Sequence, residues 1–297
     1  MSKKYNNLYK TNKRYILLAS FILFLYLVGN KNLNIIHVSL KHDFEKNYIN
    51  AKALLDDPSK EIKFLDLILV DRNGDSKKDP KKAMETSLRG KYKIENTTYI
   101  KNGITYVKNL KDVGVLVNKN RRITSSYEPE ELSRVNIPFH RTSFSKENMM
   151  VKEAARAAEK LVGDASNEKL YLKGVSAYRS YNNQETTYSY ISKTKGEEHA
   201  DVYSARPGQS EHQTGFAIDL GIRSLNYDLN ENFSNTKEGI WLSQNCYRYG
   251  FIIRYPKGKE HITGYSFEPW HIRYVGVELA KYLTENNLTL EEFYSFK

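Results

Sequence analysis

The segment SEHQTGFAIDL, residues 210–220, places a histidine and an aspartate around the pattern of a short β-strand. FAIDL is typical of a strand, and Gly215 just before it indicates a bend in the chain. His212 and Asp219 are too far apart in sequence to share one turn of a helix. A loop followed by a strand would instead bring these two side chains toward a common point.

A second polar segment, EPWHIRY at residues 268–274, carries Glu268 and His271 three positions apart. Pro269 lies between them, and proline is poorly tolerated inside a helix, so we expect an extended segment or a turn that enters a strand. Because the chain has only 7 histidines, two of them beside carboxylates in extended segments indicate a metal centre divided between two strands.

The residue types in these segments suit zinc. A catalytic zinc ion usually takes three protein ligands and leaves a fourth position for water, and His212, Asp219 and His271 would supply such a set. Glu268 would then remain free to act as a general base toward that water. Cys246 is the only cysteine, which excludes a thiolate metal framework and an intrachain disulfide. The HEXXH pattern is absent, so the spacing alone leaves open two hydrogen-bonded histidines and a solvated acidic pair.

The overall composition is that of a globular protein. The 297 residues suffice for one large domain or two small ones, with 40% hydrophobic and 27% charged residues. The net charge of +11 suits an anionic neighbourhood such as a cell wall or a membrane surface. We expect no nucleic-acid partner, because no basic stripe accompanies a recognition motif.

The N-terminal part has the layout of an export signal. Residues 1–14 are basic and are expected to form a cytoplasmic N-terminus, and residues 15–30 form an apolar segment in which Ser20 is the one clearly polar side chain before Asn30. No convincing cleavage site follows, so we expect an uncleaved signal-anchor, with a cleaved signal peptide as the alternative. Either arrangement places the bulk of the chain outside the cytoplasm, at the cell membrane or secreted.

Residues 31–111 are polar and weakly patterned, and we expect a stalk or a small accessory region. Within them, residues 64–70 resemble a buried strand, and residues 92–110 resemble a hairpin that turns at Asn102 and Gly103.

From Val113 onward strands and helices are mixed without a repeating βαβ rhythm, which predicts an α+β fold. The elements expected are a turn into a short helix (125–132), an amphipathic helix (148–162), a strand (171 to about 179), a helix (181–196), a strand (216–222), a helix running into a strand (237–256) and a closing helix pair (276–294).

Both polar segments carry motifs of a known enzyme family. SEHQTGFAIDL resembles S-x-H-x-x-G-x-A-x-D, and EPWHIRY resembles E-x-W-H-x-R-Y, of the zinc D-alanyl-D-alanine carboxypeptidases related to VanY. That family lies in the group that also holds lysostaphin-type and hedgehog-type folds. GVSAYRSYNNQ and YPKGKEHITGYSFEPWHIRYVG continue the resemblance, which covers roughly residues 112–297. It implies a zinc D,D-carboxypeptidase domain there, with helices packed on a central antiparallel sheet that carries the zinc site.

The resemblance also implies roles for individual residues. His212, Asp219 and His271 match the ligands of one zinc ion per chain, and Glu268 matches the general base. The remaining matches are Arg179, which would stabilise the oxyanion, and Gln184 and Ser210, which would line the substrate end of the pocket. Tyr178 and Trp270 are either walls of that pocket or core aromatics.

The expected activity is removal of the C-terminal D-Ala from peptidoglycan stem pentapeptides. We expect the protein to act on them as a monomer with one zinc ion per chain. An L,D-carboxypeptidase or a peptidoglycan endopeptidase would use the same residues. A wall-binding module with a relict metal site is a further alternative, although binding alone does not require a base such as Glu268 directed at water.

Overall fold

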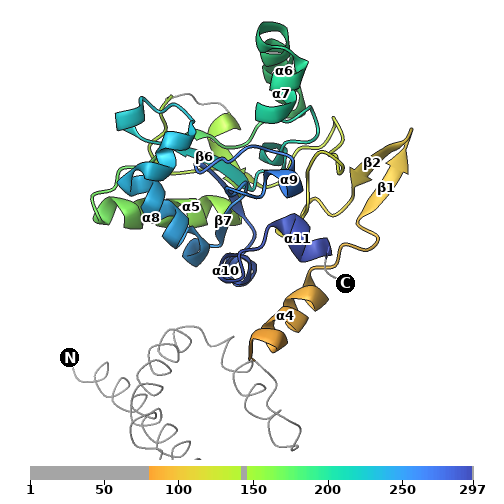
Figure 1. Ribbon diagram of the computed structural model, residues 1–297, viewed down its shortest axis with the longest axis horizontal. Coiled ribbons are helices and arrows are strands. Elements are labelled where there is room, and N and C mark those ends of the chain that lie inside the picture. The colour runs from red at the N-terminus through yellow and green to blue at the C-terminus, as the bar shows by residue number, and fades with distance from the viewer. Residues whose placement is uncertain (1–79, 142–145, 296–297) are drawn as a thin grey trace, which may run out of the picture. The chain divides into compact units, whose positions relative to one another are not determined.

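The computed structural model describes residues 80–141 and 146–295 (Figure 1). The expected strand at 64–70 and the apolar segment at 15–30 lie outside the described residues. No helix in the described part combines the length and the apolar character that a membrane span requires.

The described fold mixes helices with short antiparallel strands, as expected from the sequence. The α-helices are α4 (Pro80–Lys91), α5 (Lys152–Asn167), α6 (Tyr181–Lys195), α7 (Glu197–Tyr203), α8 (Lys237–Asn245), α9 (Glu260–Thr263), α10 (Val277–Glu285) and α11 (Leu290–Ser295). The strands are β1 (Thr98–Lys101), β2 (Ile104–Val107), β3 (Leu132–Arg134), β4 (Met149–Val151), β5 (Lys173–Ser176), β6 (Ala217–Gly221), β7 (Phe251–Ile253) and β8 (His271–Tyr274).

The central sheet has the strand order β5-β6-β8-β7, and each neighbouring pair is antiparallel. Strands β6 and β8 occupy its middle, and every residue of both strands is buried. A strand covered on both faces needs apolar neighbours along its whole length. The polar residues within β6 and β8 therefore lie inside the protein rather than on its surface.

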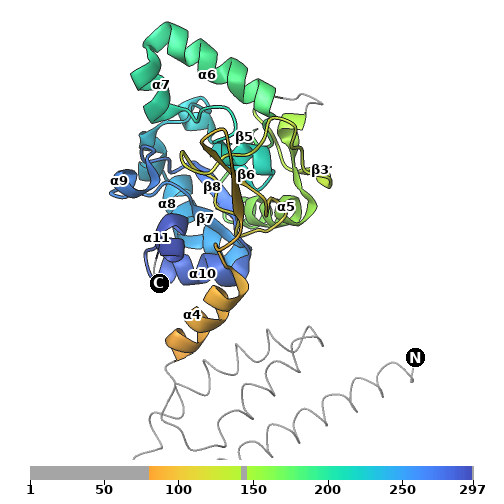
Figure 2. The same cartoon turned by 90° about the vertical axis from the view of Figure 1, so that its right-hand side faces the viewer.

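Helices supply the cover for this sheet. The buried face of α5, which includes Ala154, Ala158 and Leu161, joins the main core together with Ile218 of β6 and Leu242 of α8. A second cluster joins α4, α10 and α11 around Leu88, Leu279 and Phe293. The helices α6 and α7 project from the end of the body opposite α4 (Figure 2).

The boundaries of several elements were predicted well. The β1–β2 hairpin turns at Asn102 and Gly103, whose φ angles of 51° and 73° are those of a tight hairpin turn. Helix α6 begins after Ser180, whose hydroxyl accepts from the Asn183 amide at 3.2 Å, and it ends before Gly196.

Two local predictions were wrong. The turn expected at the start of 125–132 is present, but the short helix expected after it is absent, and Leu132 instead begins β3. The amphipathic helix begins at Lys152 rather than at 148, because residues 149–151 form β4 and pair with β3. In both places, pairing between strands distant in sequence overrides the local helical pattern.

The compact unit extends from Lys78 to Lys297. Leu88 and Val107 belong to its two apolar clusters, so part of the region 31–111 packs with the residues that follow it. The domain boundary placed at residue 112 marks where the sequence resemblance begins and stays a prediction.

Candidate metal centre

His212 reaches the centre from a short 3₁₀ helix at the entrance to β6. This helix, Glu211–Thr214, ends at Gly215, whose φ of 73° lies in the left-handed region that favours glycine. The bend turns the chain directly into the strand. The Nδ1 atom of His212 lies 2.5 Å from the carbonyl oxygen of Ala177, so the N–H of this nitrogen donates to that carbonyl. The other ring nitrogen, Nε2, is therefore left with a free lone pair.

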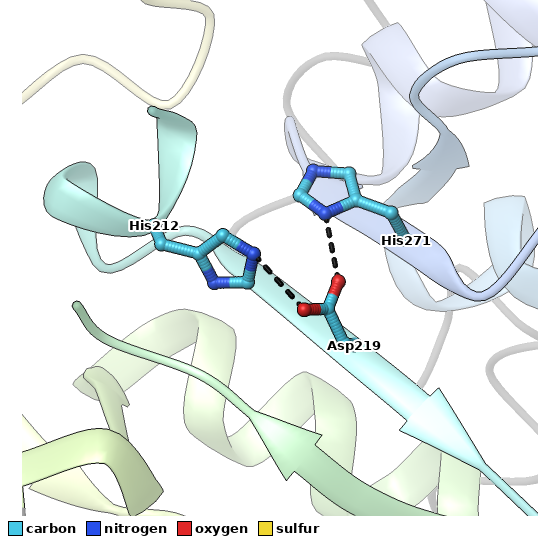
Figure 3. A group of neighbouring side chains, drawn as sticks. All are labelled: His212, Asp219 and His271. Carbon is cyan, nitrogen blue, oxygen red and sulfur yellow. Dashed lines mark hydrogen bonds and ion pairs between the residues drawn. The ribbon is translucent and has the colours of Figure 1, made fainter. Parts of the chain in front are cut away.

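Asp219 and His271 are placed by the sheet itself. They are direct partners in the antiparallel pairing of β6 with β8. His271 Nδ1 lies 2.9 Å from Asp219 Oδ1, and His212 Nε2 lies 3.2 Å from Asp219 Oδ2 (Figure 3). The two histidine rings meet edge to face, with centroids 5.0 Å apart. The two distant sequence segments thus form one group, as predicted.

This group suits a metal ion. One ligand atom from each of the three side chains lies within 4.8 Å of the others, and all three residues are buried. Two imidazole nitrogens and a carboxylate are a common zinc donor set that leaves a coordination position open. Burial lowers the pKa of His212, which favours the neutral ring that metal binding needs. The pKa of Asp219 lies far below its usual range, because the neighbouring histidines outweigh the effect of burial.

Glu268 lies beside this group. Its Oε2 atom is 4.0 Å from His271 Nδ1, and its side chain is 17% exposed. Burial raises the pKa of Glu268 to about 7, helped by the charge of Asp219 and opposed by His271. A carboxyl group with a pKa near neutral exchanges protons readily under physiological conditions, which is the property of a general base and acid.

Arg179 lies near Asp219 and is held in place by two neighbouring side chains. Its guanidinium donates to the Ser176 hydroxyl at 2.8 Å and to Gln184 Oε1 at 3.0 Å, and it lies 3.9 Å from Asp219 Oδ2. Gln184 in turn donates to the carbonyl of Ala205 at 2.7 Å. Both ends of the Gln184 amide are thus engaged within the protein, where the amide orients Arg179.

A cavity of about 380 Å³ opens onto these residues. His212, Asp219, His271, Glu268, Arg179, Gln184 and Ser210 all line it. Every site residue predicted from sequence therefore contributes to one cavity. Ser210 makes no capping hydrogen bond to the 3₁₀ helix that follows it, so its hydroxyl is not committed to that helix. The cavity also reaches Ile191 of α6 and Tyr203 of α7.

The structure distinguishes the two aromatic residues, Tyr178 and Trp270, that the sequence assigned either to the pocket wall or to the core. Trp270 lines the cavity, whereas Tyr178 is buried in the core, 2% exposed, and does not belong to the lining.

Two aromatic residues of the cavity wall, Tyr255 and Tyr265, were not predicted from the sequence. Tyr255 stacks on His271 with centroids 5.1 Å apart, and Tyr265 packs on Tyr255. The Tyr265 hydroxyl is buried and has no hydrogen-bond partner among the described residues, although Tyr265 lines the cavity. Their clustering just before EPWHIRY was the only signal in the sequence.

Comparison with known proteins agrees with this geometry. A family model described as "VanY: D-alanyl-D-alanine carboxypeptidase" matches residues 147–277. The putative carboxypeptidase YodJ of Bacillus subtilis (strain 168) is 41% identical over 223 residues, which are 75% of this chain and 81% of that protein. The chain belongs to the VanY family of D-alanyl-D-alanine carboxypeptidases.

Two solved carboxypeptidase structures share the fold. The LdcB LD-carboxypeptidase superposes with a TM-score of 0.65 at 40% identity, covering 68% of this chain and 97% of that one. A VanY D,D-pentapeptidase mutant from a VanB-type resistance cassette, in complex with Zn(II), gives a TM-score of 0.50 at 30% identity. This match covers 61% of the present chain and 98% of the mutant's chain. The chain is therefore a peptidase of this zinc-dependent family, and its cofactor is zinc, as the sequence indicated.

Proposed function

We propose that this protein is a zinc carboxypeptidase that removes the terminal D-Ala from stem peptides of peptidoglycan. The observation that carries the proposal is the meeting of His212, Asp219 and His271 at a cavity that Glu268 and Arg179 also line. An open cavity beside a three-residue donor set leaves room for both water and a peptide end.

Two specificities are compatible with this site. The sequence motifs favour D,D cleavage of pentapeptides, in agreement with the description of the matching family model. The greater likeness to the LdcB LD-carboxypeptidase, 40% identity against 30% for the VanY D,D-pentapeptidase, supports L,D cleavage of tetrapeptides. We place the L,D activity first on this ground and keep the D,D activity as the second candidate.

His212, Asp219 and His271 would hold the zinc ion. When bound, zinc supplies a Lewis acid that lowers the pKa of water and polarises the carbonyl group of the substrate. The hydrogen bond from His212 Nδ1 to Ala177 and the strand pairing of Asp219 with His271 keep these donors in place.

The proton is handled by Glu268. Its carboxylate accepts the proton of the attacking water and delivers it to the departing amine of D-Ala. A pKa raised to about 7 by burial suits both steps, because the group takes up and releases a proton near neutral pH.

Arg179 would stabilise the negative charge that develops on the attacked carbonyl oxygen. Ser176 and Gln184 fix its guanidinium, so the charged donors are oriented before the reaction begins. Ser210 lies in the same cavity wall and would contribute its hydroxyl to binding the peptide terminus.

Mass spectrometry of stem peptides tests the proposal. The zinc-loaded protein is incubated with a tetrapeptide ending in D-Ala and with a pentapeptide ending in D-Ala-D-Ala. Loss of one alanine from the tetrapeptide supports the L,D activity, and loss from the pentapeptide supports the D,D activity. Glu268→Ala protein and a chelator-treated sample should release no alanine. If both peptides stay intact while isolated cell wall is solubilised, the protein is an endopeptidase; if nothing is cleaved, it is a wall-binding module.

The proposed substrate and the N-terminal sequence together support a proposal for where the protein acts. We infer that the catalytic part lies outside the cytoplasm, tethered by residues 15–30 or released after their cleavage, and acts as a monomer. Protease treatment of intact cells should remove an extracytoplasmic domain and leave a cytoplasmic marker protein intact.

A further inference from the structure

A second buried polar cluster lies directly behind His271. It consists of Glu211, Arg254, Arg273 and Glu291, which we call the ionic quartet. The side chains of Arg254, Arg273 and Glu211 are all 0% exposed. Two arginines and two glutamates balance in formal charge, which is the condition under which buried charges are tolerated.

The contacts of Glu211 are divided between its two oxygens. Oε1 accepts from Arg254 Nε at 2.8 Å and from Arg273 Nη1 at 2.5 Å. Arg254 is clamped further by two hydrogen bonds to Glu291, at 2.7 and 2.8 Å. The carboxylate of Glu211 is thereby fixed in orientation through one oxygen.

The other oxygen points at a metal-centre residue. Glu211 Oε2 lies 3.6 Å from His271 Nε2. Both atoms are buried, and neither has a hydrogen-bond partner among the described residues. Buried polar atoms are rarely left unpaired, so two such atoms facing each other indicate a bond that closes with a small shift. The opposite ring nitrogen, Nδ1, faces Asp219 at 2.9 Å.

We infer that Glu211 is a positioning residue of the metal centre: it accepts the Nε2–H of His271 and so keeps the Nδ1 lone pair directed at the metal position. This inference rests on the ligand role proposed for His271. A ligating histidine commonly donates its second N–H to a carboxylate, which fixes both its tautomer and its orientation. The quartet adds rigidity, because both arginines hold the carboxylate through Oε1 and leave Oε2 to the ring.

A purely structural role for Glu211 makes a different prediction. If Glu211 only neutralised Arg254 and Arg273, any loss of one negative charge from the quartet should have the same effect. Glu291 provides the matched control. It belongs to the same quartet through its bonds to Arg254, and within the described part of the chain it forms no hydrogen bond or ion pair with His271. Glu211→Gln and Glu291→Gln remove the same charge and keep the side-chain shape.

The two variants should differ in zinc affinity, which chelator competition on the full-length protein measures. In Glu211→Gln, an amide NH₂ facing His271 would favour the proton on Nδ1, where it blocks the metal. We expect zinc binding weakened about 10- to 100-fold, with an altered visible spectrum of the Co²⁺-substituted protein. Glu291→Gln should lose stability but bind zinc near the wild-type level.

The outcomes distinguish the inference from the proposed function. Wild-type zinc affinity in Glu211→Gln, or an equal loss in Glu291→Gln, would overturn the positioning role. Full zinc retention in His271→Ala would instead overturn the ligand assignment itself. If Glu211→Gln does not fold, ¹⁵N-histidine NMR of the zinc-loaded wild-type protein decides: a proton on His271 Nε2 supports the inference, and a proton on Nδ1 contradicts it.

Discussion

The metal centre and the ionic quartet are two polar clusters in one core, and His271 touches both. Its Nδ1 faces Asp219 of the metal centre, and its Nε2 faces Glu211 of the quartet. In the quartet, each carboxylate accepts hydrogen bonds from a guanidinium. Only one oxygen of Glu211, the one that faces His271, has no such bond within the quartet. In the metal centre, two carboxylates and two imidazoles meet. Among the described residues, Arg179 is the one lysine or arginine within ion-pair distance of this group, at 3.9 Å from Asp219.

The two clusters differ in how completely their charges are paired, and this difference separates a structural cluster from a ligand-binding one. Charges that are fully paired inside a protein hold a structure in place but offer nothing to a ligand. Acceptors that converge beside a cavity without a matching cation form a site that a metal ion completes. The predictions below test this division, beginning with the largest expected effect.

Glu268→Gln should reduce turnover about 10²- to 10⁴-fold while zinc stays bound, because the amide keeps the shape but accepts no proton. Steady-state kinetics on the cleaved peptide, with metal content measured on the same samples, checks both parts. Near-normal turnover would show that another group acts as the base.

Arg254→Leu should destabilise the protein by about 3–5 kcal/mol, because it leaves Glu211 and Glu291 buried without their shared partner. Urea unfolding of the metal-free protein measures this cost. The control is Arg206→Leu, which removes a half-exposed ion pair with Asp201 and Glu197 and should cost less than about 1 kcal/mol. Equal costs would contradict the view of the quartet as the structural cluster.

Glu268→Gln should also stabilise the metal-free protein above neutral pH. The pKa of Glu268 rises from its ordinary value of 4.5 to about 7 because burial disfavours the charged form. The folded state therefore binds this proton more tightly, and ionisation of Glu268 costs stability as the pH rises through that window. At pH 8 the gain should approach at most about 3 kcal/mol.

The control for this gain is the same comparison at pH 4, where the carboxyl group is protonated and the difference should nearly vanish. Thermal unfolding at both pH values measures it. A gain of equal size at pH 4 would assign the effect to packing instead of charge.

Cys246→Ala tests a core position outside both clusters. The thiol is buried, and burial raises its pKa to about 12, so the side chain behaves as a small apolar group. We expect a loss of about 1 kcal/mol in unfolding experiments and unchanged zinc affinity. A marked fall in zinc affinity would show that general core stability, and not specific contacts, governs the metal centre.

The metal centre was predictable because its residues lie in two short motifs, each of which runs into a recognisable strand. Asp219 and His271 occur in segments whose extended character is visible in the sequence, and strand pairing brings them face to face. The quartet was not predictable in this way. Arg254 directly follows β7 and Arg273 lies in β8, and their partners are set by long-range contacts that no local pattern records. Similarly, β3 and β4 replaced expected helical turns because each pairs with the other.

The contacts of Arg273 have a consequence for how the site assembles. Its Nη2 donates to the carbonyls of Val113 and Val115, which are 160 and 158 positions earlier in the chain. Contacts of such wide separation form late, because the chain loses loop entropy before it gains their energy. We therefore expect the peptidase to acquire its metal at the end of folding, after the segment around Val113 has closed over β8. A chain still emerging from the ribosome would remain inactive until that closure.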